Sequence, residues 1–419
     1  MTADRLLGKP GSGTQRHRAP HYPRDNGKGN RRLQVQRARR YRRASRSRAA
    51  LSLTPLNQTT YMPHRYSPGS GSVGAVSARF VRALVCGLAV GLAMTSPSAA
   101  ATPTAGLDRL KDNLYGTKFV DPDHGWVVGA FGSVFRSDDG GQTWTPQASK
   151  TTESLYDVDF IDTQRGWAVG RSGTILHTED GGKNWEAQAS GVDKHLFSVD
   201  FVDARHGVVA GDWGAILVTD DGGRTWENHA LQDDVILNDV SMTDASHGWI
   251  AGEMGTILHT EDGGRSWTPQ TTGVDKSLFG VYFADAQHGW AVGIDALILR
   301  TDDGGQTWRV QNGSTEIREL EMVGFSSAYE NPSLYAVQVV GDLGIAVGEI
   351  GAVYTSSDGG RTWARRPGDA AGGPKWFRAL SLVPGTHGVI VGAGGERLRV
   401  VDGKVESPSG GTRASETLH

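Results

Sequence analysis

One eight-residue string recurs six times between residues 137 and 363, and it restricts the fold more than any other feature of the chain. Its form is Ser/Thr-x-Asp-Gly-Gly-x-x-Trp, and successive copies lie 41 residues apart except for the last, which follows after 55. A fixed period in this range indicates a solenoid or a propeller, in which each repeat packs against its neighbours. The Asp and Trp residues of the six boxes are Asp139 and Trp144, Asp180 and Trp185, Asp221 and Trp226, Asp262 and Trp267, Asp303 and Trp308, and Asp358 and Trp363.

Three further runs precede the box in each period. In the second period they are the alternating run 155–162, the GWAVG run from Gly166 and the TILHT run from Thr174. All are short, rich in β-branched and aromatic residues, and separated by Gly and Asp, so we expect them to be strands. Together with the tail after the box Trp they make four strands per period, which is one blade of a propeller.

The number of first strands gives the number of blades. They are expected to begin at seven positions, namely Leu114, Leu155, Leu196, Leu237, Leu278, Leu334 and Phe377. We therefore predict an all-β, seven-bladed propeller of four-stranded antiparallel blades over residues 102–408, followed by a disordered tail at 409–419. The seventh unit has lost its box, which leaves six or eight blades as alternatives. A closed ring needs an outer strand for this unit, from residues 405–407 or from residues 102–107.

The front of the chain differs from the rest in charge. Residues 1–82 carry 18 of the 43 basic residues but 2 of the 46 acidic ones, so the remainder holds 25 basic and 44 acidic residues. A segment this rich in Arg, without apolar periodicity, cannot bury enough surface to fold, and we expect residues 1–75 to be disordered. We favour an artefact of the gene start, with translation beginning later, for instance at Met62; if the segment is real, it is disordered. The Arg cluster at 37–43 is of a kind that binds nucleic acid, but the acidic body is not expected to do so.

Residues 76–101 have the order of an export signal. Arg79 and Arg82 precede an apolar run at 83–94, and small residues follow up to Ala101, so we expect cleavage near Ala100 or Ala101. The run is about 12 residues long, too short to span ~30 Å of hydrocarbon, and an uncleaved anchor is the alternative. We expect an exported, periplasmic or extracellular monomer with no integral membrane span after cleavage.

The box residues are predicted to be structural. The Asp can accept backbone N–H groups in a tight turn, the glycines supply positive φ, and the Trp packs its ring between sheets. The alternative is a cation held by pairs such as Asp220 and Asp221, but these lack further ligands. A second unit, Asp-x-x-His-Gly-Trp, places Asp121 three residues before His124, and we interpret it as a turn cap. We predict no bound metal and no cofactor.

These boxes, alternating with GWAVG and GTILHT runs, resemble the Asp-box (BNR) repeats of the photosystem II assembly-factor-like propellers. The resemblance covers about residues 110–405. It implies a non-enzymatic module that docks on a membrane-protein complex or its unassembled subunits during assembly, as in photosynthesis. The arginine-bearing face of the photosynthetic members would correspond here to Arg171, Arg318 and Arg378.

The turns between the second and third strands of each blade are predicted to share a rim with the links between blades, opposite the boxes. Their residues vary on a constant scaffold, which favours an interaction surface. The link at 312–333 is 22 residues long and partly apolar, so we expect it to be a contact loop. The alternative is that Phe131 and Trp213 fold down onto neighbouring blades. The predicted partner-binding residues are Phe131, Arg171, Trp213, Glu253, Met254, Asp295, Arg318, Phe325, Ile350 and Arg378.

Two other functions remain open. Asp boxes also occur in glycosidases, and an acid pair could come from the inner-strand residues Asp157, Asp159, Asp200 and Asp239, whose simpler role is hydrogen bonding at the wet inner edge. A sialidase is disfavoured, because the inner strands offer Arg378 as their only arginine. The second alternative is a general peptide-binding scaffold without a link to membranes.

Overall fold

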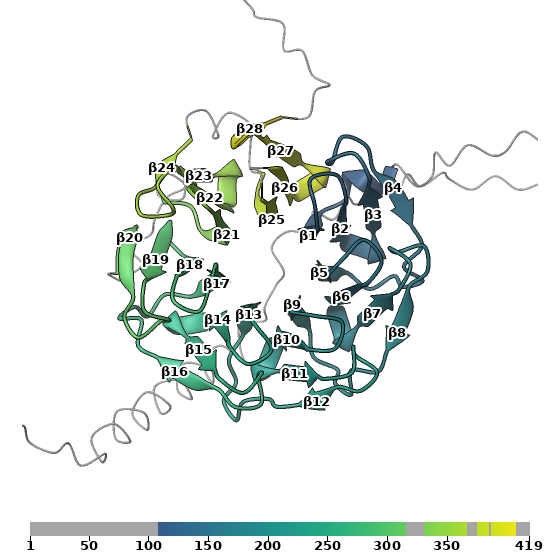
Figure 1. Cartoon of the computed structure of the whole chain (residues 1–419), viewed down its shortest axis with the longest axis horizontal. Coiled ribbons are helices and arrows are strands. Elements are labelled where there is room, and N and C mark those ends of the chain that lie inside the picture. The colour runs from purple at the N-terminus through teal and green to yellow at the C-terminus, as the bar shows by residue number, and fades with distance from the viewer. Residues whose placement is uncertain (1–107, 316–330, 367–374, 385–386, 408–419) are drawn as a thin grey trace, which may run out of the picture. The chain divides into compact units, whose positions relative to one another are not determined.

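The computed structural model describes residues 108–315, 331–366, 375–384 and 387–407. They form seven four-stranded antiparallel sheets, arranged around a central axis as the blades of a propeller (Figure 1). The predicted all-β, seven-bladed fold is therefore confirmed. All seven first strands begin at the residues that the repeat predicts.

The strands of each blade run outward from the axis in chain order. Blades one and two comprise β1 (Leu114–Phe119), β2 (Gly125–Gly129), β3 (Val134–Ser137) and β4 (Thr145–Gln147), then β5 (Leu155–Phe160), β6 (Gly166–Gly170), β7 (Ile175–Thr178) and β8 (Glu186–Gln188). Blades three and four comprise β9 (Leu196–Phe201), β10 (Gly207–Gly211), β11 (Ile216–Thr219) and β12 (Glu227–Asn228), then β13 (Leu237–Met242), β14 (Gly248–Gly252), β15 (Ile257–Thr260) and β16 (Thr268–Gln270). Blades five, six and seven comprise β17 (Leu278–Phe283), β18 (Gly289–Gly293), β19 (Leu297–Thr301) and β20 (Arg309–Asn312), then β21 (Leu334–Val340), β22 (Leu343–Gly348), β23 (Val353–Ser356) and β24 (Ala364–Arg365), then β25 (Phe377–Val383), β26 (His387–Gly392), β27 (Arg397–Val401) and β28 (Lys404–Glu406).

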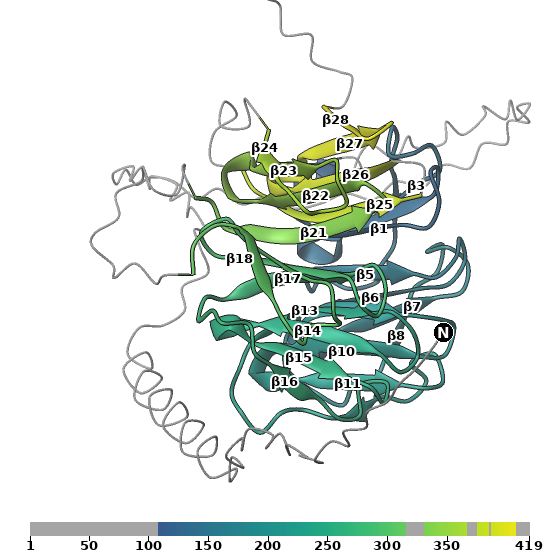
Figure 2. The ribbon, with the colours of Figure 1, turned by 60° about the vertical axis from the view of Figure 1, so that its left-hand side comes forward.

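Within the described residues, no sheet combines strands from the two ends of the chain. β28 is the outer strand of blade seven, which confirms the first of the two predicted closures, whereas residues 102–107 lie outside the described residues. Side chains join blade seven to blade one, where β25 and β1 lie side by side (Figures 1 and 2). The Phe119 N–H donates to Ser381 Oγ at 2.8 Å, and Arg399 Nε donates to the Gly140 carbonyl at 3.0 Å.

A cluster of three rings fills the space between neighbouring blades. Trp126 on β2 stacks face to face on Phe160 of the next blade, with ring centroids 3.6 Å apart, and the box residue Trp185 meets Phe160 edge-on at 5.8 Å. Trp126 Nε1 also donates to the Gly181 carbonyl in the next blade's box at 3.0 Å. The same ring cluster recurs twice, as Trp167, Phe201 and Trp226 and as Trp249, Phe283 and Trp308. The repeat thus binds each of these blades to its successor.

The box forms the tight turn between the third and fourth strands of a blade, and hydrogen bonds to its Asp hold this turn together, as predicted. In blade two, Asp180 Oδ1 accepts from Thr178 Oγ1 and from the Asn184 N–H, both at 2.9 Å. Gly181 and Gly182 have φ of 72° and 89°, which glycine adopts without strain. The Gly181 N–H donates to the Gln164 carbonyl at 2.7 Å, which ties the box to the turn between the first and second strands. Burial alone would raise the pKa of Asp180, but the hydrogen bonds from Asn184 and Thr178 outweigh it and lower that pKa.

Several predicted segments lie outside the described residues: the Arg-rich segment 1–75, the signal 76–101, most of the link 312–333 with Arg318 and Phe325, and the tail 409–419. None of the helical turns within the described ranges is long and apolar enough to cross a bilayer.

Replacing Asp180 by Ala should destabilise the propeller by about 1–2 kcal/mol, because the N–H and O–H donors of the box turn lose a charged acceptor. Urea unfolding at pH 7 measures the loss. The adjacent exposed residue gives the control, since Glu179→Ala should change the free energy of unfolding by less than about 0.5 kcal/mol. Equal effects of the two substitutions would show that the carboxylate of Asp180 is dispensable.

Candidate functional site on the link rim

Backbone hydrogen bonds divide the turns between two rims. Each box turn bonds to the turn between the first and second strands, as in the Gly140 N–H donation to the Asp123 carbonyl at 2.9 Å. Each turn between the second and third strands bonds instead to the link entering its blade, as in the Arg171 N–H donation to the Ser154 carbonyl at 2.9 Å. The predicted partition is confirmed, and we call this second set of turns and links the link rim.

Three large apolar side chains are exposed on the link rim. Phe131 is 63% exposed, Trp213 55% and Met254 53%, and they occupy the same position in the 3-10 turns η2 (Ala130–Gly132), η4 (Asp212–Gly214) and η5 (Glu253–Gly255). Within the described residues Val310 is the one further large apolar side chain of this kind, at 41%. The alternative in which Phe131 and Trp213 fold down onto neighbouring blades is therefore wrong.

These side chains stand on left-handed backbone. Phe131, Trp213 and Met254 have φ of 55°, 57° and 56°, and Ile350 of blade six has the same conformation at 56°. In blade seven the position holds glycine, Gly394, at 60°. A non-glycine residue costs about 1–2 kcal/mol in this region, and such strain is concentrated at functional sites. Four blades keep a bulky apolar residue where glycine would be least strained, whereas blades two and five have Ser172 and Asp295 there, at 55° and 62°. The sequence pattern did not reveal this conformation.

Phe131→Gly should raise the free energy of unfolding by about 0.5–1 kcal/mol, since it relieves the left-handed strain and removes a side chain that is mostly in water. Chemical denaturation measures the change. The converse substitution Gly394→Ala should lower stability by a similar amount, and its Cβ would meet nothing nearer than the Lys111 carbonyl oxygen at 3.9 Å, an ordinary contact, so strain alone is tested. A loss of stability in Phe131→Gly would contradict the proposed strain.

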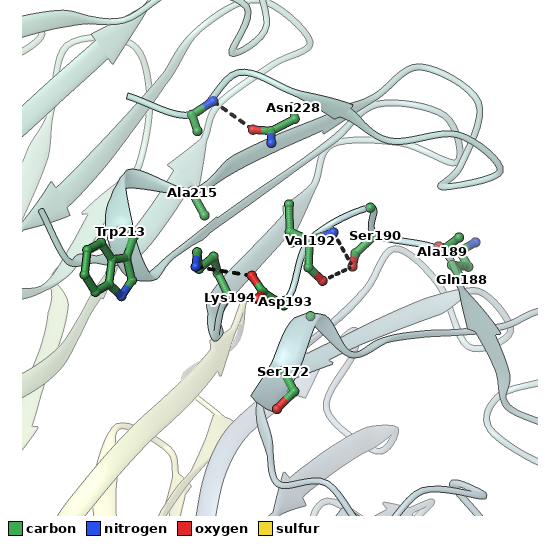
Figure 3. Close-up of a pocket in the computed structure, with 13 residues that line it drawn as sticks. Ser172, Gln188, Ala189, Ser190, Val192, Asp193, Lys194, Trp213, Ala215 and Asn228 are labelled. Atoms are coloured by element: carbon green, nitrogen blue, oxygen red, sulfur yellow. Dashed lines mark hydrogen bonds and ion pairs between the residues drawn. The ribbon is translucent and has the colours of Figure 1, made fainter. Parts of the chain in front are cut away.

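Trp213 flanks a groove of about 700 Å³ between blades two and three. The link 190–194 forms one side, and Ser172 of η3 (Arg171–Gly173) and Asn228 of β12 add polar groups (Figure 3). Lys194 Nζ lies 5.5 Å from the Trp213 ring centroid and 3.2 Å from Asp193 Oδ1. Figure 3 shows the indole at one end of the groove, and the groove thus joins an aromatic surface to polar groups.

The other predicted partner-binding residues differ in their surroundings. Arg171 is exposed on the link rim, 3.7 Å from Glu153, and Glu253 and Ile350 are half-buried in their turns. Asp295 accepts from the buried Lys276 Nζ at 2.8 Å. Arg378 lies on the inner strand β25, with its guanidinium 5.3 Å from the Tyr335 ring centroid. The structure therefore places Arg378 at the channel and the others on the link rim.

The inner-strand aspartates accept hydrogen bonds from the following blade. Asp157 Oδ2 accepts from the Val199 N–H at 3.0 Å, and Asp239 Oδ2 accepts from the Val281 N–H at 2.8 Å. Asp159 and Asp200 bind the N–H groups of Phe201 and Met242 in the same way, at 2.8 and 2.7 Å. These bonds support the simpler role of holding neighbouring inner strands together.

Burial is the largest influence on the pKa of three of these carboxyls, those of Asp157, Asp200 and Asp239. It raises the pKa of Asp157 and Asp200 to about 7 and that of Asp239 to about 6. Lys118 Nζ lies 2.6 Å from Asp159 Oδ1. Burial alone would lower the pKa of Lys118, but the carboxylates of Asp159 and Asp200 outweigh it and raise that pKa.

Stability should fall as pH rises from about 4 to 7. A raised carboxyl pKa means that the folded chain holds the proton more tightly than the unfolded chain, so the stabilisation is present below pH 4 and is lost as pH approaches 7. Asp159, Asp239, Lys118 and Arg378 are the other charged side chains of the inner strands. Asp200→Asn should flatten the profile of unfolding free energy against pH. Glu179→Gln is the control, and an unchanged slope in Asp200→Asn would contradict the assignment.

The fold and the box geometry define a closed seven-bladed Asp-box β-propeller. A family model described as "Photosynthesis system II assembly factor YCF48" matches residues 104–190, 185–272 and 267–381, and the chain belongs to this family. No curated protein matches the chain.

Solved structures share the propeller at low sequence identity. "YCF48 bound to D1 peptide" is 21% identical, covers 70% of this chain and 92% of its own, and has a TM-score of 0.56. YCF48 from Cyanidioschyzon merolae is 21% identical, with coverages of 70% and 96% and a TM-score of 0.54. A GH74 xyloglucanase from Xanthomonas campestris is 18% identical, with coverages of 69% and 52% and a TM-score of 0.54. At these identities the likeness shows the fold alone.

Proposed function

We propose that this protein is a non-enzymatic assembly factor that docks on a subunit of a membrane-protein complex through the link rim. The observation that carries the proposal is the exposure of Phe131, Trp213 and Met254 at equivalent turns on strained backbone. Membership of the assembly-factor family supports it, and the relative bound to a D1 peptide is a protein-binding propeller.

The chemistry of the three side chains suits a protein partner. Aromatic residues and Met are enriched at protein interfaces, and a few buried anchors supply most of the binding energy. Full burial of each such side chain is worth about 1.5–3 kcal/mol. The groove beside Trp213 adds polar groups that can bind a peptide backbone.

We further propose that the propeller acts outside the cytoplasm, on the basis of the charged, apolar and small-residue order at 76–101. Fractionation of expressing cells, with N-terminal sequencing of the recovered protein, tests this. Recovery of the uncleaved chain from the cytoplasm would contradict it.

The link rim can be tested with three substitutions to Asn, a residue that tolerates left-handed backbone. Phe131→Asn, Trp213→Asn and Met254→Asn together should abolish capture of membrane-protein subunits from detergent-solubilised envelope, with identification by mass spectrometry. Val310→Asn is the control, since it removes an exposed apolar side chain from β20. Capture of soluble proteins alone would favour the general peptide-binding scaffold. Unchanged capture by the triple variant would contradict docking through the link rim.

A glycosidase is the second candidate. It is favoured by the raised pKa values of Asp157 and Asp200, which suit a general acid, and by the fold shared with the xyloglucanase. We rank it below docking because each inner-strand carboxylate already accepts a backbone N–H. Hydrolysis of a glycan panel by the unmodified protein, lost in Asp157→Asn with Asp200→Asn, would establish it, and an inactive unmodified protein ends it.

A further inference from the structure

Aromatic rings surround the mouth of the central channel on the link rim. They stand at the second position of the inner strands, directly after the blade links, and are all half-buried. The Tyr115 and Tyr156 ring centroids are 5.8 Å apart, those of Tyr156 and Phe197 5.6 Å, and those of Phe279 and Tyr335 5.4 Å. We call these five rings the mouth collar. Its aromatic side chains come from blades one, two, three, five and six, so the collar forms only when the propeller is closed.

The second position of the two remaining blades is polar. Blade four supplies Asn238, whose Nδ2 donates to the Leu278 carbonyl at 2.8 Å, and blade seven supplies Arg378. The Arg378 guanidinium lies over the Tyr335 ring, 5.3 Å from its centroid. The collar therefore already holds one cationic group against an aromatic face, which is a favourable contact.

Carboxylates follow the collar immediately. Asp157 comes directly after Tyr156, and Asp239 directly after Asn238. The seven inner strands carry four aspartates against two cations, Lys118 and Arg378. Lys118 is paired with Asp159, and Asp157 has no ion-pair partner among the described residues. At pH 8, above the raised pKa values of Asp157 and Asp239, the channel thus has an excess of negative charge just inside an aromatic entrance.

We infer that the mouth collar binds a lysine or arginine side chain from an extended segment of the partner. The alkyl stem would lie against the rings, and the charged head would face Asp157 and Asp239. Charge complementarity selects this occupant, because an anionic side chain would be repelled by the inner strands and a neutral one would leave their charge uncompensated. The inference rests on the proposed docking at the link rim and specifies the chemistry of the partner.

Labelled nonapeptides with blocked ends test the inference by fluorescence anisotropy at pH 8, above the raised pKa values of Asp157 and Asp239. They consist of Gly and Ser with Lys, norleucine or Glu at three positions. We expect the Lys peptide to bind at least tenfold more tightly than the other two, with an affinity that falls as salt is added. Asp157→Asn with Asp239→Asn should weaken the Lys peptide at least tenfold. Glu179→Gln with Glu261→Gln removes two charges from the opposite rim and should leave its affinity unchanged.

A second variant tests the rings. Tyr115→Leu with Tyr156→Leu retains apolar side chains but removes two aromatic faces, and it should also weaken the Lys peptide. Thermal unfolding of each variant shows whether it is folded, and the comparison of peptides on the unmodified protein is independent of any variant. Equal binding of the Lys and norleucine peptides, tighter binding of the Glu peptide, or no binding of any peptide would overturn the inference.

The experiments distinguish failure of the proposed docking through the link rim from failure of the proposed cation site. If the Asn variants of the link rim abolish capture of membrane-protein subunits but no Lys peptide binds, docking stands and the cation site is wrong. If the Lys peptide binds as expected and no membrane-protein subunit is captured, the mouth collar is a cation site and the proposed assembly function is wrong.

Discussion

The burial of apolar side chains between neighbouring blades is the constraint on which the structure depends, and at three of the seven interfaces it includes a Trp stacked on a Phe of the next blade. A four-stranded sheet has two apolar faces, and neither can be buried within a single 41-residue repeat. Trp126 covers one face of Phe160, and its indole N–H also reaches the carbonyl of Gly181, so one side chain sets both the spacing of the sheets and the position of the neighbouring box. The recurrent residues of the repeat therefore have a structural role, which is to pack one blade against the next.

The side chains of the box rim serve stability, whereas those of the link rim are available for recognition. On the box rim, the polar groups of each turn are used within the turn, as the bonds to Asp180 show. On the link rim, the same backbone conformation recurs while its side chain changes from Phe131 to Trp213 to Gly394. The peripheral apolar side chains and the mouth collar face the same side, so a partner that spans both would meet apolar groups outside and negative charge at the axis.

Much of this could be predicted from the sequence, because the repeat fixes the positions of the strands and the alternation fixes their faces. The starts of the first strands, the role of the boxes and the exposure of Trp213 all follow from such local signals. The left-handed conformation at Phe131 could not be predicted, since nothing local distinguishes it from an ordinary turn. The mouth collar was missed although rings at 115, 156 and 197 follow the 41-residue period, because its contacts exist only once the ring has closed.

The seam between blades seven and one has a mechanical consequence. Every other pair of neighbouring blades is linked by the chain itself, but here β28 completes its own sheet, and among the residues that the structure describes the gap is bridged by side chains such as Ser381 and Arg399. No hydrogen-bonded ladder must be unzipped to part these two blades. Parting them would leave every sheet whole but would expose the apolar side chains that pack across the seam, among them Phe119, Val383 and Val389, so the seam is held by apolar burial together with these few polar contacts.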